Sequence, residues 1–265
     1  MRPFAPKDNT LARYEMKYLV DVRLLEPIRD FVTTFCGPDP FCRGDPPEYG
    51  VKTLQFDSPW GGLYRAKENK ALNRFKLRAR TYENDTTPLF LEIKRKLGDV
   101  VMKTRVVFKP GWDDLESLIM GNQVSPLMRH GDEMAFLEFR RLMQQIGARP
   151  SCFIRYQRES YISENDAYAR VTFDRSMRYQ PTSYWAMEPR CEDWRRMDTG
   201  TALRRPFPAF VLELKTSDNM PTWMAELVER FNLTRCGFCK YATALRLESL
   251  LRGAQYSDAS ENCTY

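Results

Sequence analysis

A strict alternation of charged and apolar residues is the feature that most constrains the fold of this chain. In the segment 74–82, RFKLRARTY, cations occupy every second position from Arg74 to Arg80. Successive side chains of a β-strand point to opposite faces, so these cations share one face while Phe75 and Leu77 lie on the other. Such a strand needs an apolar partner for one face, and water or an anion for the other.

The same alternation recurs along the chain and predicts eight strands. They span 13–20, 49–57, 74–82, 89–97, 100–108, 151–162, 167–174 and 209–215. All except 49–57 place charged residues together on one face. One such strand is most often an amphipathic strand of a sandwich whose charged face is solvated. Seven in one chain favour a second arrangement, in which a curled sheet brings the charged faces together.

Helical patterns account for most of the remaining sequence, and such helices can cover the apolar faces of the strands. They span 22–35, 112–120, 133–146, 221–231 and 241–251, with Asp21 as a candidate N-cap of the first. We therefore predict an α+β fold, a closed antiparallel β-barrel tunnel of about eight strands with helices packed on the outside. A single domain is predicted over residues 11–253, with flexible tails at 1–10 and 254–265.

The residue types present exclude several kinds of chemistry. His130 is the only histidine among 265 residues, so histidine metal clusters are excluded, and a histidine-based triad could use that residue alone. Cys236 and Cys239 form one CxxC, which more often indicates reduced thiols than a zinc site. No apolar run approaches the roughly 18 residues of a membrane-spanning helix, and no signal peptide is evident, so we expect a cytoplasmic protein.

If the charged faces of the strands meet, they line a lumen with many cations and few acids. The acids are chiefly Glu15, Glu92 and Glu213. The cations are Lys17, Arg78, Arg80, Lys94, Lys96, Lys103, Arg105, Arg158 and Arg170. Concentrated like charges are costly unless a polyanion neutralises them, and both lysine and arginine bind phosphate oxygens. The ratio favours a polyphosphate chain together with a divalent metal held by a carboxylate.

The order and spacing of several short motifs resemble a known family over nearly the whole chain. These motifs are RYEMKY at 13–18, LQFDS at 54–58, KLRARTY at 76–82, LEIKRK at 91–96, YQR at 156–158, RVTFD at 170–174, LELK at 212–215 and FCKY at 238–241. The chain resembles the catalytic domain of the vacuolar transporter chaperone (VTC) polyphosphate polymerases, within the triphosphate tunnel metalloenzymes, in its stand-alone bacterial form. Cys239 departs from the serine that is usual before the late lysine.

The resemblance implies a metal-dependent phosphotransferase whose partners are ATP and polyphosphate. The residues implied to be catalytic are Arg78, Arg80, Lys94, Arg158 and Arg170. Those implied to bind substrate are Lys17, Lys67, Lys96, Lys103, Tyr156 and Lys240. Glu213 is implied to hold Mn²⁺ or Mg²⁺, while Glu15 and Glu92 either bind metal or orient Lys17 and Lys94.

Three alternative functions are compatible with the sequence. A tunnel triphosphatase would use the same ligands with water as the nucleophile, although the scarcity of carboxylates favours the polymerase. A non-catalytic polyphosphate sensor would not need the metal-holding Glu213. A nucleic-acid binder fits least well, because the basic faces carry few aromatic residues for base stacking. We therefore expect no nucleic-acid partner and no membrane insertion.

Overall fold

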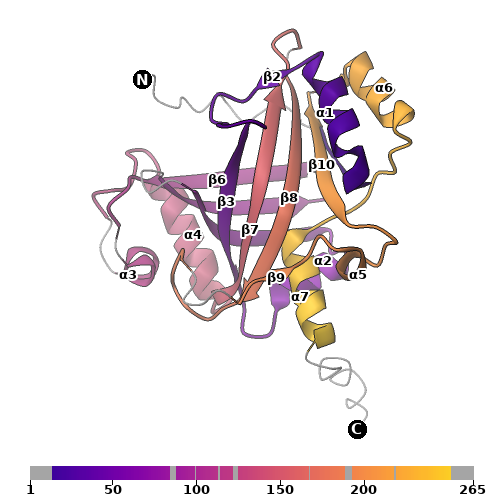
Figure 1. The fold of residues 1–265 in the computed structure, drawn as a ribbon. Coiled ribbons are helices and arrows are strands. Elements are labelled where there is room, and N and C mark those ends of the chain that lie inside the picture. Colours follow the sequence, from indigo (N-terminus) through magenta and orange to yellow (C-terminus); the bar gives the residue numbers. More distant parts are fainter. Residues whose placement is uncertain are drawn as a thin grey trace. The chain divides into compact units, whose positions relative to one another are not determined.

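The computed structural model describes residues 14–83, 88–98, 100–112, 114–121, 125–166, 168–188, 193–217 and 219–251. Its strands are β1 (Tyr14–Asp21), β2 (Gly37–Pro38), β3 (Glu48–Asp57), β4 (Asn73–Tyr82), β5 (Leu89–Leu97), β6 (Val100–Phe108), β7 (Arg149–Ile162), β8 (Ala169–Pro181), β9 (Arg195–Arg196) and β10 (Ala209–Thr216). Its helices are η1 (Val22–Leu24), α1 (Leu25–Thr33), α2 (Gly62–Glu68), α3 (Leu115–Met120), α4 (Glu133–Gln145), α5 (Gly200–Leu203), α6 (Thr222–Arg230) and α7 (Lys240–Leu251) (Figure 1). The predicted tails lie outside the described residues.

The period-two patterns located all eight principal strands. The bounds of β5 and β6 coincide with the prediction, whereas β8 continues to Pro181, seven residues beyond the predicted end at Asp174. Asp21 caps the first helical segment as predicted, because its side chain accepts a hydrogen bond from the backbone N–H of Arg23. The short helices α2 and α5 were not predicted, since neither is long enough to show a helical period.

The prediction of a closed barrel is wrong for the described residues. The sheet is antiparallel, but its strand order is the open path β1-β10-β8-β7-β3-β4-β5-β6. The outer edge of β1 bonds to another segment, since Tyr18 bridges Arg235 and Cys236 N–H donates to the Lys17 carbonyl at 2.8 Å. Similarly, Arg129 N–H donates to the Val107 carbonyl of β6 at 2.8 Å. In each end strand, part of the backbone hydrogen-bonding edge is therefore paired with a nearby segment, and the two end strands do not pair with each other.

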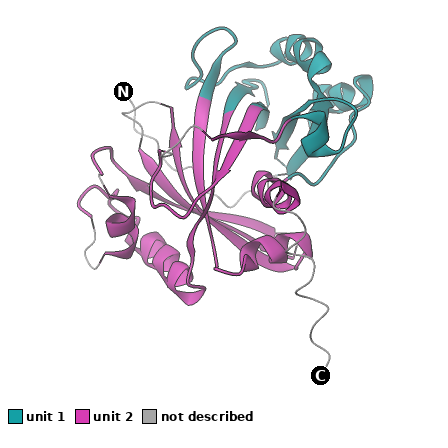
Figure 2. Ribbon diagram, turned by 60° about the horizontal axis from the view of Figure 1, so that its bottom comes forward, with its two compact units in different colours: residues 1–49, 157–175, 199–238 teal, residues 50–156, 176–198, 239–265 magenta. Residues whose placement is uncertain are grey.

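The chain divides into two compact units (Figure 2). Unit 1 contains residues 1–49, 157–175 and 199–238, and unit 2 contains residues 50–156, 176–198 and 239–265.

In unit 1, α1 and α6 lie side by side (Figure 1) and cover an apolar core. Phe31 of α1 meets Phe231 edge-on at 6.2 Å between ring centroids, and Phe35 stacks on Trp223 at 5.4 Å. The core beneath them contains Val171 and other apolar residues of β1, β8 and β10. Burial of these faces leaves the alternate, charged positions of the same strands on the opposite side of the sheet.

In unit 2, α4 packs on the apolar face of β5 and β6. Phe136 of α4 meets Phe108 edge-on at 5.5 Å between ring centroids, and Phe139 meets Phe56 at 6.1 Å. Leu77 of β4 is completely buried in the same core. Helix packing thus covers the apolar face of this sheet region, as the alternation predicted. Among the described residues, no helix has the length and hydrophobicity required to cross a bilayer.

Candidate functional site

The charged side of β4, β5 and β6 forms a continuous cationic surface in unit 2. The strand register places Lys76 opposite Lys94, and Lys94 opposite Lys103. We call this surface the cationic face. Its eight basic side chains and one carboxylate are Arg74, Lys76, Arg78, Arg80, Lys94, Lys96, Lys103, Arg105 and Glu92. The parity predicted from the sequence therefore holds across three neighbouring strands.

Glu92 is the charge centre of the cationic face. It is completely buried, and Oε2 accepts a hydrogen bond from Arg78 Nε at 2.6 Å. Its Oε1 lies 2.5 Å from Lys103 Nζ and accepts a hydrogen bond from Arg105 at 2.8 Å, while Arg80 lies 3.7 Å away. Burial alone would raise the pKa of Glu92, but these four cations hold it well below its ordinary value. Glu92 therefore remains ionised.

Lys103 has an environment that disfavours its own charge. Desolvation, together with repulsion from Arg105, Arg78 and Arg80, outweighs the attraction of Glu92 and lowers the pKa of Lys103 to about 6. Its side chain nevertheless keeps 33% of its exposure, so an incoming anion can reach it. Within these three strands, basic side chains on this face outnumber carboxylates eight to one, so the strands contribute a positive charge to the surface.

The start of α7 contacts the cationic face and the strand β7. Lys76 Nζ lies 2.9 Å from the Sγ atom of Cys239. The next residue, Lys240, places its ammonium 4.3 Å from the ring centroid of Tyr156, within the range of a cation–π contact. The late FCKY motif thereby brings two of the implied substrate-binding residues, Tyr156 and Lys240, together.

A second charged cluster lies in unit 1, on β1, β8 and β10. The register places Glu213 opposite both Lys17 and Thr172. Lys17 Nζ lies 3.4 Å from Glu213 and 2.7 Å from Glu15, while Lys215 lies 3.3 Å from Glu213. Burial would raise the pKa of Glu213, but Lys215 and the other neighbouring cations hold it well below its ordinary value. We call these residues, with Arg158 at 3.7 Å from Glu213, the Glu213 cluster.

The two implied catalytic arginines of unit 1 are held by carboxylates. Arg158 binds Asp174 through two hydrogen bonds of 2.6 and 2.7 Å. Arg170 lies 2.8 Å from Asp39 and donates to the Ser160 hydroxyl at 2.9 Å. Each cation of this region thus has a carboxylate close by. Its charge is therefore nearly balanced.

The carboxylates of Glu213 and Glu15 offer the kind of oxygen atom that Mg²⁺ and Mn²⁺ bind. Glu213 and Glu15 both approach the same ammonium, that of Lys17, so two carboxylates converge on one place. In the described part of the chain, no group of three or more His, Cys, Asp or Glu residues could hold a metal. A metal here would take one or two protein carboxylates and fill its remaining positions with substrate oxygens and water, as Mg²⁺ commonly does.

The structure sorts the predicted site residues into these two places. The cationic face or the start of α7 contains Arg78, Arg80, Glu92, Lys94, Lys96, Lys103 and Lys240, with Tyr156 beside Lys240. The region around Glu213 contains Glu15, Lys17, Arg158 and Arg170. Lys67 lies on α2, and no hydrogen bond or ion pair links its side chain to either place among the described residues.

Sequence reasoning missed several members of the site. Parity places Lys215 on the face of Glu213, but the family resemblance implies no role for it. The sequence also did not indicate that Asp174 is the partner of Arg158. Asp39 lies in the loop after β2, and no sequence signal marks it as the partner of Arg170. Such partnerships join residues far apart in the sequence, so only the folded chain reveals them.

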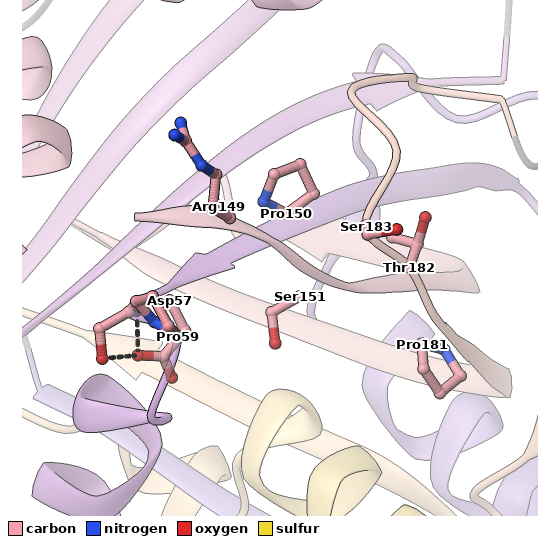
Figure 3. Close-up of a pocket in the computed structure, with 9 residues that line it drawn as sticks. Asp57, Pro59, Arg149, Pro150, Ser151, Pro181, Thr182 and Ser183 are labelled. Carbon is pink, nitrogen blue, oxygen red and sulfur yellow. Dashed lines mark hydrogen bonds between the residues drawn. The ribbon is translucent and has the colours of Figure 1, made fainter. Parts of the chain in front are cut away.

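A separate pocket of about 390 Å³ lies in unit 2 (Figure 3). It is lined by Asp57, Ser58, Pro59, Arg149, Pro150, Ser151, Pro181, Thr182 and Ser183. None of the predicted site residues lines it. The Asp57 carboxylate is already bound by the backbone N–H groups of Ser58, Leu63 and Tyr64, so it serves the start of α2.

The sequence model of the VTC domain matches residues 12–248, and the chain belongs to the VTC domain family. No curated protein sequence matches the chain significantly.

Two solved structures resemble the fold at a distance. The PH1819 protein from Pyrococcus horikoshii OT3 is 10% identical to this chain. The match covers 91% of this chain and 99% of PH1819, with a TM-score of 0.43. HpAC1 from Hippeastrum is described as a putative adenylyl cyclase with a dominant triphosphatase activity, and it is 14% identical to this chain. The match covers 89% of this chain and 96% of HpAC1, with a TM-score of 0.45.

Proposed function

We propose that this protein is a polyphosphate polymerase that transfers the terminal phosphate of ATP to a growing polyphosphate chain. The observation that supports this most is the composition of the cationic face: β4, β5 and β6 place eight basic side chains there, and Glu92 is the one carboxylate that these three strands contribute. Three adjacent strands present these cations at the spacing of a sheet. An extended polyanion can contact many of them at once, whereas a small anion can contact only a few.

In this proposal, the Glu213 cluster of unit 1 is the candidate metal site. Glu213, with Glu15, would hold Mn²⁺ or Mg²⁺, and such an ion supplies neutralisation of charge on the phosphate oxygens. Because the cations of this region are already balanced by carboxylates, it suits a phosphate group that arrives with a metal. Arg158 and Arg170 are held in fixed orientations by Asp174 and Asp39, which preserves their geometry for phosphate contacts.

The chemistry follows from positioning and charge. A terminal oxygen of the polyphosphate chain attacks the γ-phosphorus of ATP in line, a new P–O bond forms, and the bond from this phosphorus to the β–γ bridging oxygen breaks to release ADP. Arg78, Arg80 and Lys94 bind non-bridging oxygens and stabilise the charge that shifts between them. Glu92 keeps the two arginines oriented. No histidine takes part, in agreement with the sequence.

One observation supports a second candidate, a triphosphatase. Because the pKa of Lys103 is about 6, its side chain is a neutral amine in a large fraction of the molecules at neutral pH. A neutral amine can accept a proton from water. In that case water would attack the terminal phosphorus and free phosphate would be released.

Incubation of the purified protein with ATP and Mn²⁺, followed by gel electrophoresis of the products, separates these functions. A ladder of lengthening polyphosphate supports the polymerase, and free phosphate without a ladder supports the triphosphatase. Arg78→Ala and Glu213→Gln are expected to abolish turnover. Arg141→Ala is a matched control, because Arg141 is an exposed arginine on α4 that pairs with Glu138 of the same helix. Full turnover by Arg78→Ala would overturn the assignment of the cationic face.

A further inference from the structure

Three consecutive residues at the start of α7 each contact a different strand of unit 2. Cys239 meets Lys76 of β4, and Lys240 lies over Tyr156 of β7. The hydroxyl of Tyr241 lies 2.7 Å from Oδ2 of Asp57, the last residue of β3. This start of the helix is therefore fixed at three points.

The contact between Tyr241 and Asp57 is the best-protected of the three. Asp57 is 2% exposed, and its ionised carboxylate can only accept hydrogen bonds, so Tyr241 is the donor. The Ser151 hydroxyl lies 2.9 Å from the Tyr241 oxygen and therefore donates to it. Burial, followed by the nearby charge of Asp57, raises the pKa of Tyr241 far above its ordinary value, so the phenol keeps its proton at any working pH.

Lys240 and Tyr241 leave the helix in directions about 100° apart, since an α-helix has 3.6 residues per turn. Anchoring Tyr241 on one side consequently directs Lys240 toward the other, where the Tyr156 ring lies. A lysine side chain has many rotamers, so the ammonium is placed reliably only when its backbone is held. The anchor thus restricts where the Lys240 charge can be found.

We propose that Tyr241 and Asp57 are positioning residues, which fix the start of α7 so that Lys240 presents its ammonium to a bound polyphosphate chain. This inference rests on the proposed function, because it takes Lys240 as a phosphate ligand. Asp57 also receives the N–H groups of Leu63 and Tyr64, so the same carboxylate fixes α2 and α7 together. Tyr241 belongs to α7, so its substitution removes the anchor of α7 and leaves the hydrogen bonds between Asp57 and α2 in place.

The test is a double-mutant cycle with Tyr241→Phe and Lys240→Met. The dissociation constant for inorganic polyphosphate, measured without nucleotide, is expected to rise roughly three- to tenfold in Tyr241→Phe, as loss of one buried hydrogen bond would produce. In the double variant the dissociation constant should equal that of Lys240→Met alone. In turnover assays the KM for polyphosphate should rise while kcat changes little.

Tyr64→Phe is the matched control, because it removes the hydroxyl of a neighbouring tyrosine on α2 and leaves the Asp57 hydrogen bonds in place. It should leave polyphosphate binding unchanged. If Tyr241→Phe does not fold, Ser151→Ala removes the other partner of the phenol and should weaken binding to a smaller extent. Additive effects of the two α7 substitutions, or unchanged binding in a folded Tyr241→Phe protein, would overturn the proposal. Because binding is measured without ATP, this outcome is distinct from a failure to synthesise polyphosphate.

Discussion

Replacement of Glu92 by glutamine tests the electrostatic core of the cationic face. Glutamine keeps the shape of the side chain but removes the negative charge that pairs with Arg78, Arg80, Lys103 and Arg105. Breaking a buried ion pair by removing one partner costs about 3–5 kcal/mol, because the remaining charges stay desolvated without compensation. We expect the free energy of unfolding of Glu92→Gln to fall by an amount in this range at pH 7.

The assay is urea unfolding of the wild type and of Glu92→Gln, with and without inorganic tripolyphosphate. A ligand that binds only the folded protein adds ~2.7 kcal/mol at a hundredfold excess over its dissociation constant, so tripolyphosphate should recover much of the loss. Glu138→Gln is the matched control, because Glu138 pairs with Arg95 and Arg141 on the opposite side of the sheet and is partly exposed. Its loss should cost at most about 1 kcal/mol.

The pH dependence of stability follows from the same carboxylate. The pKa of Glu92 is depressed in the folded state, so its contribution is fully present above the ordinary glutamate value of 4.5 and is lost as the pH falls through the lower, folded-state pKa. A Glu92→Gln protein that is as stable as the wild type at pH 7 would refute the reasoning. It would mean that the four cations do not depend on this carboxylate.

Three further predictions concern protons, metal and thiol chemistry. Because Lys103 has a pKa of about 6 without ligand and a bound polyanion favours its ammonium form, polyphosphate binding above pH 6 should take up a proton and weaken as the pH rises. Titration calorimetry in buffers of different ionisation enthalpy measures this uptake, and Lys103→Met should abolish it. Glu15→Gln should raise the Mn²⁺ concentration for half-maximal activity without changing polyphosphate binding in the presence of a chelator. Lys96→Met should weaken that binding without changing the Mn²⁺ concentration, and equal effects of both variants on both quantities would contradict the division of roles. Cys239→Ser can keep the hydrogen bond to Lys76, so activity should remain within about twofold of the wild type, and a larger loss in a steady-state assay would show that the thiol itself is required.

The sequence by itself determined the strands and their faces. Period-two alternation is a local property of the extended backbone, so segments such as 74–82 and 89–97 revealed both their secondary structure and the side on which their cations lie. The same parity placed Glu92 on the charged face of segment 89–97 and Glu213 on the charged face of segment 209–215. The family resemblance, carried by short motifs, agrees with the VTC domain match over residues 12–248.

Only the tertiary structure decided which charges meet and how the sheet ends. The four cations around Glu92 come from neighbouring strands, and the pairing of Arg170 with Asp39 joins residues 131 positions apart, so register and loop path determine both. Closure failed as a prediction because edge hydrogen bonds go to whichever segment lies nearby, here around Arg235 for β1 and Arg129 for β6. Alternation fixes the face of a residue, but contacts between distant segments fix its partner, and no local pattern encodes them.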